Sequence, residues 1–317
     1  MEYVHTSVMV EEVMEYLGPK SKNGTVIDAN TGEGGHSHAF LSEYTESNLI
    51  CIDADSEILE IAKKRLAKFE GRVNFYNGWS FDFFNNYPIQ FNKPDSILFD
   101  LGISFYHYKV SGKGFTFEKD EFLDMRINSN EGSTAADFLA RLPEKELADL
   151  LYNNAEERYS RRIASVIVNE RQKSAITTTS ALAELVYRAV PTHYRHGQIH
   201  PATRTFQALR IAVNGELVKL HALLEAALRA LNPGGRIGVI TFHSLEDRIV
   251  KNFFRTMNKN CICPPSAPIC KCTQRRSVNI LTKKGITPTD DEIVRNPPSR
   301  SARLRVVEKV PDGEENG

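Results

Sequence analysis

Acidic residues end three short apolar segments in the first third of the chain. The segments TVID, NLICID and SILFD end at Asp28, Asp53 and Asp100, and the first runs into the glycine-containing loop ANTGEGGH. Short apolar runs of this kind are typical of buried parallel strands, whose carboxyl ends meet at one edge of a sheet. In open α/β sheets that edge binds the ligand, and glycine lets the backbone approach it closely. The pattern predicts a nucleoside-cofactor site lined by carboxylates.

The charge of the loop distinguishes a dinucleotide site from a site for S-adenosylmethionine. Dinucleotide-binding folds use Gly-x-Gly-x-x-Gly to hold a pyrophosphate at a helix N-terminus, whereas residues 32–36 read Gly-Glu-Gly-Gly-His. Glu33 would repel a pyrophosphate, but it suits S-adenosylmethionine, which has no phosphate and carries an ammonium and a sulfonium. Asp53, which follows Asp28 by 25 residues, is placed to accept hydrogen bonds from ribose hydroxyls. The alternative is a parallel sheet whose strand ends are acidic without binding a cofactor.

Charge is unevenly spread along the chain although the formal net charge is zero. Residues 251–289 contain eight Lys or Arg and no acid, and residues 185–215 contain four Arg and three His without a carboxylate. Stretches of this kind can contact the phosphates of a nucleic acid. The alternative is a solvated basic surface that acids elsewhere in the fold balance.

The N-terminal sequence mixes acids with apolar residues at helical spacing, and it lacks the continuous apolar run of a signal peptide. No stretch of the sequence approaches the length of a membrane span. We therefore expect a cytoplasmic protein with no membrane partner, in which the five cysteines are reduced. Cys51 lies within an apolar segment and is expected in the core.

The other four cysteines form two Cys-x-Cys pairs separated by a proline-containing stretch: Cys261, Cys263, Cys270 and Cys272. Structural zinc sites usually separate the ligands of a pair by two or more residues, so this spacing is weaker support for metal than paired Cys-x-x-Cys. A proline-stiffened loop of reduced thiols and a redox pair are the alternatives. We assign no metal site from the sequence.

The predicted strands alternate with helical patterns only in part of the chain. Strands are expected at residues 25–28, 49–53, 72–76 and 96–100, with helices between them, which favours a parallel sheet. From about residue 103 to 200 the periodicity is that of amphipathic helices without a convincing strand. This stretch is expected to be a helical insertion.

The alternating pattern then resumes. One long helix is expected over residues 205–231, ended by Asn-Pro-Gly-Gly and followed by a fifth strand at residues 236–242. Residues 278–284 and 301–307 are suited to closing the sheet edge as a hairpin. The expected division is a discontinuous sheet domain at residues 1–102 and 200–310, a helical insertion at 103–199, and a disordered tail at 311–317.

Four sequence blocks resemble one protein family closely. HPATRTFQALRIAVNGEL (200–217), GRIGVITFHSLEDRIVKNFF (235–254), FLDMRIN (122–128) and NPPSRSARLR (296–305) are similar to signature blocks of the bacterial ribosomal small-subunit RNA cytosine-N4 methyltransferases, the MraW or RsmH type. The resemblance runs nearly from end to end. It implies an α/β protein whose class I (Rossmann-like) methyltransferase sheet is interrupted by a helical, substrate-recognising domain.

The resemblance also implies the reaction and the cofactor site. S-adenosylmethionine would donate the methyl group, and a cytidine in the decoding region of 16S rRNA, within the small ribosomal subunit, would accept it. Carried over by position, the cofactor contacts are Gly34, Gly35, His36, Asp53, Trp79, Asp100 and His107. Trp79 replaces the usual phenylalanine and can still stack. This chain departs from the usual family sequence around His107, Lys113 and Glu121. The resemblance places these residues at the entrance of the pocket for the methyl acceptor, so that entrance is expected to differ from the family pattern.

The exocyclic amine of cytosine is a poor nucleophile, and a hydrogen-bond acceptor on its N–H would assist attack on the methyl group. Asp100 or a neighbouring backbone carbonyl is the candidate acceptor, although cofactor binding explains Asp100 equally well. His243 and Ser244 could contact a flipped base, or Ser244 could only cap a helix. The candidate phosphate or base contacts Arg126, Arg204 and Arg300 could instead pair with acids.

These observations favour an rRNA (cytosine-N4) methyltransferase. Two alternatives stay open: a class I methyltransferase with a protein or small-molecule substrate, and a ribosome assembly factor that keeps the fold without turnover. A homodimer is compatible with either.

Overall fold

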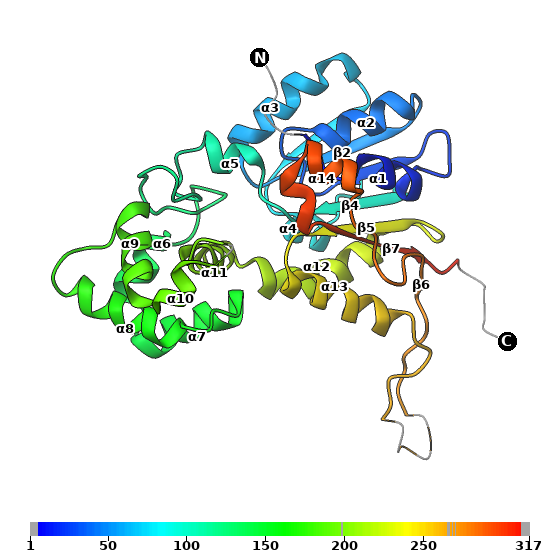
Figure 1. Ribbon diagram of the computed structural model, residues 1–317. Helices are drawn as coiled ribbons and strands as arrows, with labels where there is room; N and C mark the ends of the chain where they lie inside the picture. Colours follow the sequence, from blue (N-terminus) through cyan, green and yellow to red (C-terminus); the bar gives the residue numbers. More distant parts are fainter. Residues whose placement is uncertain (1–5, 198, 265–266, 268, 270, 312–317) are drawn as a thin grey trace. The chain divides into compact units, whose positions relative to one another are not determined.

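The computed structural model describes residues 6–197, 199–264, 267, 269 and 271–311. The chain divides into two compact units, a sheet unit formed by Met1–Ile103 and Lys219–Gly317 and a helical unit formed by Ser104–Val218 (Figure 1). The sequence places the second part of the sheet domain from residue 200, whereas in the structure it begins at Lys219. The difference arises because helix α11 (Ala202–Asn214) packs on other helices of the helical unit. Cys270 and residues 312–317 of the expected tail lie outside the described residues.

The sheet unit contains seven strands in the order β3-β2-β1-β4-β5-β7-β6. The strands are β1 (Thr25–Asp28), β2 (Asn48–Asp53), β3 (Val73–Asn77), β4 (Ser96–Asp100), β5 (Arg236–Thr241), β6 (Val278–Ile280) and β7 (Arg303–Lys309). The first five pair in parallel, and β7 runs antiparallel to β5 and β6. The predicted α/β fold with a mainly parallel sheet is confirmed.

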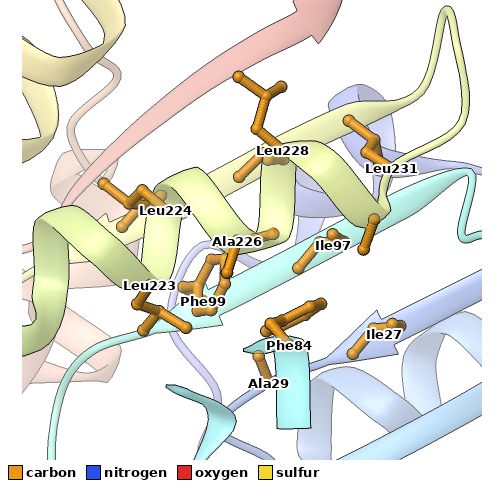
Figure 2. Close-up of a cluster of buried hydrophobic side chains, with 14 of the residues drawn as sticks. Ile27, Ala29, Phe84, Ile97, Phe99, Leu223, Leu224, Ala226, Leu228 and Leu231 are labelled. Carbon is orange, nitrogen blue, oxygen red and sulfur yellow. The ribbon is translucent and has the colours of Figure 1, made fainter. Parts of the chain in front are cut away.

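Helices cover both faces of this sheet, which explains why the central strands are apolar throughout. One face carries α1 (Val10–Leu17), α2 (Gly35–Glu43) and α3 (Ser56–Leu66), and the other carries α4 (Ser80–Asn85), α12 (Glu216–Ala230) and α13 (Ser244–Met257). Figure 2 shows Leu223 and Ala226 of α12 beside Phe99 of β4. The core holds the strand ends rigidly, so the loops that follow them are fixed in place.

The C-terminal segments close the sheet edge in a more elaborate way than a simple hairpin. β6 and β7 pair antiparallel as predicted, but α14 (Asp290–Arg295) and the 3-10 helix η2 (Pro297–Ser301) lie between them in the chain. A second short 3-10 helix, η1 (Ala67–Phe69), follows α3. Within the described part of the chain, no helix has both the length and the apolar composition that crossing a membrane requires.

The helical unit confirms the predicted change from alternating elements to helices. It contains α5 (Phe105–Lys109), α6 (Ala135–Arg141), α7 (Glu144–Ala155), α8 (Ser160–Arg171), α9 (Thr179–Ala189), α10 (Thr192–Arg195) and α11. The prediction of one long helix over residues 205–231 is wrong. Gly215 has φ 62°, a left-handed conformation that ends α11 before α12 begins.

Candidate functional site

The loop between β1 and α2 is tied to its neighbours by its own backbone. The Thr31 N–H donates to the carbonyl of Ile52 in β2 (2.9 Å), and the Thr31 hydroxyl donates to the carbonyl of Asp28 (3.0 Å). The Gly34 N–H in turn donates to the Thr31 carbonyl (2.9 Å). These bonds fix the path of the loop across the carboxyl ends of β1 and β2.

Two adjacent glycines are required where this loop enters α2. Gly34 has φ 77°, which a residue with a side chain adopts only with strain. Gly35 has no such backbone need, but a Cβ there would lie 1.9 Å from the Ser7 Oγ. The chain thus needs Gly34 for its conformation and Gly35 for space.

Asp53, the predicted ribose contact at the end of β2, also organises the loop. Its Oδ2 accepts a hydrogen bond from the Gly32 N–H (2.8 Å), and its Oδ1 accepts one from the Asp55 N–H (2.9 Å). A carboxylate offers about four acceptor positions, which is the capacity that binding two ribose hydroxyls draws on. The arrangement supports the predicted role, and the role itself stays a prediction.

Trp79 lies just beyond β3, the strand that neighbours β2. The preceding Gly78 donates its N–H to the Asp53 carbonyl (2.9 Å), and Trp79 is the N-cap residue of α4. The next residue, Ser80, donates its buried hydroxyl to the carbonyl of Ala29 in the β1 loop. The Lys219 ammonium lies 6.0 Å from the centroid of the Trp79 ring. The backbone on either side of Trp79 is thus tied to the ends of β2 and β1, at the sheet edge where the resemblance predicts the adenine.

The remaining strand-end carboxylate in the first half of the sheet is Asp28, which is buried. Its Oδ2 accepts from the Ser37 hydroxyl (2.6 Å), and Ser37 Oγ also lies 3.3 Å from the Cys51 Sγ. Burial raises the pKa of Asp28, although His36 and Ser37 oppose that rise. Burial likewise raises the pKa of Cys51, which lies in the core as predicted.

His36 and Asp100 approach each other at the same sheet edge. His36 Nε2 donates to the carbonyl of Val8 (2.8 Å), so the ring presents Nδ1 to Asp100 Oδ2 at 3.7 Å. Burial raises the pKa of Asp100 to about 6, with His36 lowering it and the charge of Asp28 raising it further. Asp100 is therefore a carboxylate that changes charge near neutral pH.

Glu246 also raises the pKa of Asp100 through its charge, and sequence analysis did not assign it to the site. It is buried, and its Oε2 accepts from the Phe242 N–H (2.9 Å) and the His243 N–H (3.3 Å). The sequence signal was present, because Glu246 follows the end of a predicted strand by a few residues. An acid in the first turn of a helix is common without any role in a site, so the sequence alone does not single it out.

His243, not Ser244, caps α13, which corrects the capping alternative considered above. His243 Nδ1 accepts from the Glu246 N–H (3.4 Å), and His243 Nε2 lies 3.0 Å from Glu246 Oε1. Ser244 is the first residue of the helix and is exposed. Ser244 is thus free of the capping role, while His243 is committed to Glu246.

The structure places His107 in the helical unit, within the short helix α5. It is buried, its ring makes an edge contact with Phe115 (centroids 5.2 Å apart), and its carbonyl accepts from the Ser111 hydroxyl (2.8 Å). These contacts account for the histidine within its own unit. The predicted contact of His107 with the cofactor is not tested by them and stays a prediction.

Arg126 lies in a segment that the rest of the helical unit holds tightly. Its Nε and Nη2 donate to the two oxygens of Asp124 (2.6 and 3.0 Å), a pairing that raises the pKa of Arg126. Met125 between them is buried with φ 60°. Asn214 clamps this strained residue, because its Nδ2 donates to the Met125 carbonyl (2.8 Å) and its Oδ1 accepts from the Ile127 N–H (2.9 Å). Strained, over-determined backbone of this kind is common at functional sites.

The other two predicted arginines differ in their surroundings. Arg204 is partly buried and donates to the carbonyl of Glu156 (3.1 Å), so it contacts backbone in place of an acid. Arg300 is exposed at the end of η2. An arginine in NPPSRSARLR that sequence analysis did not single out, Arg305, is buried and pairs with Asp247 through two bonds (2.6 and 3.0 Å).

The chemistry of the sheet edge suits a cationic nucleoside more than a phosphate. Asp28 Oδ1, Asn30 Oδ1 and Asp100 Oδ1 are buried acceptors with no hydrogen-bond partner among the described residues. Such acceptors are costly to leave unpaired and indicate that a donor ligand belongs there. Ammonium groups and ribose hydroxyls are donors, whereas a pyrophosphate is not.

Comparison with known proteins gives a consistent result. The model of the MraW methylase family matches residues 2–310. A protein of Treponema denticola named ribosomal RNA small subunit methyltransferase H is 55% identical over 98% of both chains. A protein of the same name from Caldicellulosiruptor saccharolyticus is 44% identical over 97% of this chain and 100% of that one. A methyltransferase of Streptococcus mutans, solved with SAH, is a remote structural likeness (12% identity, TM-score 0.42, 96% of this chain and 100% of that one).

Proposed function

Because the chain belongs to the MraW methylase family, we propose that it transfers the methyl group of S-adenosylmethionine to N4 of a cytidine in the decoding region of 16S rRNA. The observation that carries the proposal is the gathering of Asp28, Asp53 and Asp100 beside a loop that itself contains Glu33. This edge favours a cation and ribose hydroxyls over a phosphate. Relatives that span this chain almost completely are named as small-subunit rRNA methyltransferases.

In this proposal, different residues of the sheet unit contact different parts of the cofactor. Asp53 accepts from the ribose, Trp79 lies against the adenine, and the loop at Gly34 and Gly35 allows close backbone approach. Asp100 and Asp28 face the positive methionine portion. When bound, S-adenosylmethionine supplies an electrophilic methyl group.

Asp100 is the candidate acceptor for the amino group of the target cytosine. At neutral pH a carboxyl with a pKa of about 6 is mostly ionised and can accept an N–H, which helps the nitrogen lone pair become available. The same charge would also attract the sulfonium. These two roles are separable, because an acceptor acts on the rate of transfer whereas a counter-ion acts on cofactor affinity.

Aromatic and basic side chains of the helical unit support an RNA substrate. The Arg195 guanidinium lies over the Tyr187 ring (4.9 Å), and the ring centroids of His200 and Phe117 are 4.6 Å apart. Single-stranded RNA is typically bound by such stacking surfaces next to positive charge. Two other arginines of the basic stretch pair with acids, Arg188 with Glu184 and Arg210 with Glu216, so the stretch is less basic than its sequence suggests.

The decisive experiment uses small subunits from cells that lack this enzyme. Labelled methyl from S-adenosylmethionine is offered with the full-length protein, and the RNA is digested to nucleosides. N4-methylcytidine is the expected product. Label in ribosomal protein would support the protein-methyltransferase alternative, and binding of subunits without any transfer would support an assembly factor.

An Asp100→Asn variant separates the two roles of that carboxylate. If Asp100 accepts the amine, single-turnover transfer at saturating cofactor falls by roughly 10²-fold or more. If only the affinity for S-adenosylmethionine falls, the catalytic role is wrong. Glu60→Gln, an exposed acid of α3, is the matched control for loss of one negative charge.

A further inference from the structure

Three cysteine sulfurs gather in the segment that joins α13 to β6. The Sγ atoms of Cys261, Cys263 and Cys272 all lie within 4.8 Å of one another. Cys261 Sγ and Cys272 Sγ, which belong to different Cys-x-Cys pairs, are 3.7 Å apart. Nothing in the proposed methyl transfer uses these residues.

The separation of one sulfur pair, Cys261 and Cys272, matches the coordination shell of a thiophilic metal, and Cys263 lies within 4.8 Å of both. A tetrahedral Zn²⁺ site with Zn–S bonds of about 2.3 Å places neighbouring sulfurs about 3.8 Å apart. A disulfide would need an S–S distance of about 2.05 Å, so the separation of Cys261 and Cys272 is that of co-ligands and not of a bonded pair. We propose that Cys261, Cys263 and Cys272 bind one divalent transition metal ion, with zinc as the preferred metal, and so staple this segment.

Backbone N–H groups point at two sulfurs of the cluster. The Cys263 N–H points to the Cys261 Sγ (3.4 Å), and the Ile262 N–H points to the Cys272 Sγ (3.5 Å). Hydrogen bonds to ligand sulfurs are the usual outer support of metal–thiolate sites, because they orient the ligand and disperse its charge. The segment is therefore folded around its sulfurs.

The tertiary structure also removes the objection raised by the sequence. The short Cys-x-Cys spacing weakens the case for a metal only if each pair must act as a zinc knuckle. In the structure, the close contact is made across the two arms of the segment, from Cys261 to Cys272. Cys270 lies outside the described residues, and the three described sulfurs carry the proposal by themselves.

A metal would supply what the segment lacks in apolar core. Ile262 is 52% exposed and Ile269 is 70% exposed, so these two apolar side chains contribute little burial. Its base is closed by the Ser277 N–H, which donates to the Met257 carbonyl (2.9 Å), and the sulfurs join the arms farther out. Short segments without a core commonly depend on such a crosslink.

The staple would hold a strongly basic segment in one shape. Residues 258–277 contain no acid, and their basic residues are Lys259, Lys271, Arg275 and Arg276. Fixing the arms fixes the spacing of these charges, which matters for any polyanion that they contact. The metal is thus inferred to be structural, with no part in methyl transfer, and the inference does not depend on the proposed function.

The test is metal binding by the full-length, reduced protein. The chain is purified without chelator for metal analysis, then stripped and titrated with Co²⁺. About one equivalent of metal per chain is expected. Bound Co²⁺ should show the sulfur-to-cobalt charge-transfer band and the intense visible bands of a tetrahedral thiolate site, and Zn²⁺ should abolish both. X-ray absorption should then count at least three sulfur neighbours of the zinc.

Variants assign the metal to these sulfurs. Cys261→Ser and Cys272→Ser should each reduce bound metal to less than about a tenth of an equivalent, while Lys271→Ala, in the same segment, should retain it. Metal loss should also accelerate trypsin cleavage after Arg275 and Arg276 by at least about tenfold, since an opened segment exposes both bonds. Retention of metal by both cysteine variants would overturn the proposal. So would a native chain that binds no Co²⁺ under reducing conditions, or one in which Cys261 and Cys272 are found as a disulfide.

Discussion

His36 Nδ1 lies 3.7 Å from Asp100 Oδ2, and the opposite ring nitrogen of His36 donates to the carbonyl of Val8. The Val8 bond keeps a proton on Nε2, so Nδ1 is the ring atom that faces Asp100. The pair therefore links the N-terminal segment to the end of β4 through a contact whose strength depends on pH. Burial raises the pKa of Asp100 to about 6, so the charge of this carboxyl changes in weakly acidic solution.

Cofactor affinity should fall in weakly acidic solution. The sulfonium and ammonium favour ionised Asp100, so the affinity for S-adenosylmethionine should be nearly full above about pH 7 and fall about tenfold between pH 7 and pH 5. Titration of the protein with cofactor across this range measures the effect. Asp100→Asn should bind more weakly at pH 7 and show a flat profile, and an unchanged slope in that variant would assign the titration to another group.

The stability of the unliganded protein should have the opposite pH dependence. The folded pKa of Asp100 is raised above its unfolded value of about 4, so its favourable contribution is complete below about pH 4 and is lost as the pH rises through about 6. Asp100→Asn should then stabilise the free protein at pH 7.5 by on the order of 1–3 kcal/mol. Urea unfolding of both proteins at pH 5 and pH 7.5 measures this, with a smaller difference expected at pH 5.

The only tryptophan of the chain, Trp79, should report cofactor binding directly. If the adenine lies against this ring, S-adenosylmethionine should quench the fluorescence in a saturable way. Trp79→Phe should keep affinity within about threefold because stacking is retained, whereas Trp79→Ala should lose about tenfold. Both variants lack tryptophan fluorescence, so calorimetry provides their affinities. If Trp79→Ala binds the cofactor as tightly as the native protein, the indole does not contact it.

The space beside Gly35 should be set by Ser7. A Gly35→Ala substitution places its Cβ 1.9 Å from the Ser7 Oγ, and overpacking of this kind costs about 1–3 kcal/mol. Removing the obstructing side chain with Ser7→Gly should recover most of the lost stability and cofactor affinity in the double variant. A double-mutant cycle measures the coupling, and simple additivity of the two changes would contradict the contact.

Asn214 should affect binding of the RNA substrate and not binding of the cofactor. Its amide holds the strained Met125 backbone next to Arg126, so Asn214→Ala leaves buried backbone groups unpaired at a cost of about 1–3 kcal/mol. We expect the KM for small subunits to rise while the affinity for S-adenosylmethionine is unchanged. Asn154→Ala is the matched control, because it removes a hydrogen bond from a side-chain amide to the Ala208 carbonyl in the same unit. A change in cofactor affinity would contradict the assignment.

Removing one member of the Arg305–Asp247 ion pair should destabilise the protein more than replacing both members. Asp247→Asn or Arg305→Met alone should destabilise the protein by about 3–5 kcal/mol, because each leaves a poorly compensated charge. The double variant Arg305→Met/Asp247→Leu should be less destabilised than either single variant. Denaturant unfolding tests this order, and equal, additive losses would assign the arginine a simple packing role.

The sequence alone was sufficient for the parallel sheet, the helical insertion and the acidic strand ends. Strands such as TVID and SILFD are apolar throughout, and helices such as α3 show clear periodicity, so local pattern and burial agree there. Asp28, Asp53 and Asp100 could be placed at one edge because the ends of parallel strands converge in any such sheet. Similarity of whole sequence blocks then indicated the reaction class.

Only the tertiary structure decided the features that depend on distant partners or on single backbone angles. The left-handed Gly215 divides one periodic pattern into α11 and α12, and helix packing moves the unit boundary to Val218. The raised pKa of Asp100 comes from burial and from carboxylates far along the chain. The contact between Cys261 and Cys272 joins two arms whose spacing gave little support for a metal. Periodicity records which face of a local element is buried, but it carries no information about which remote side chain will meet it there.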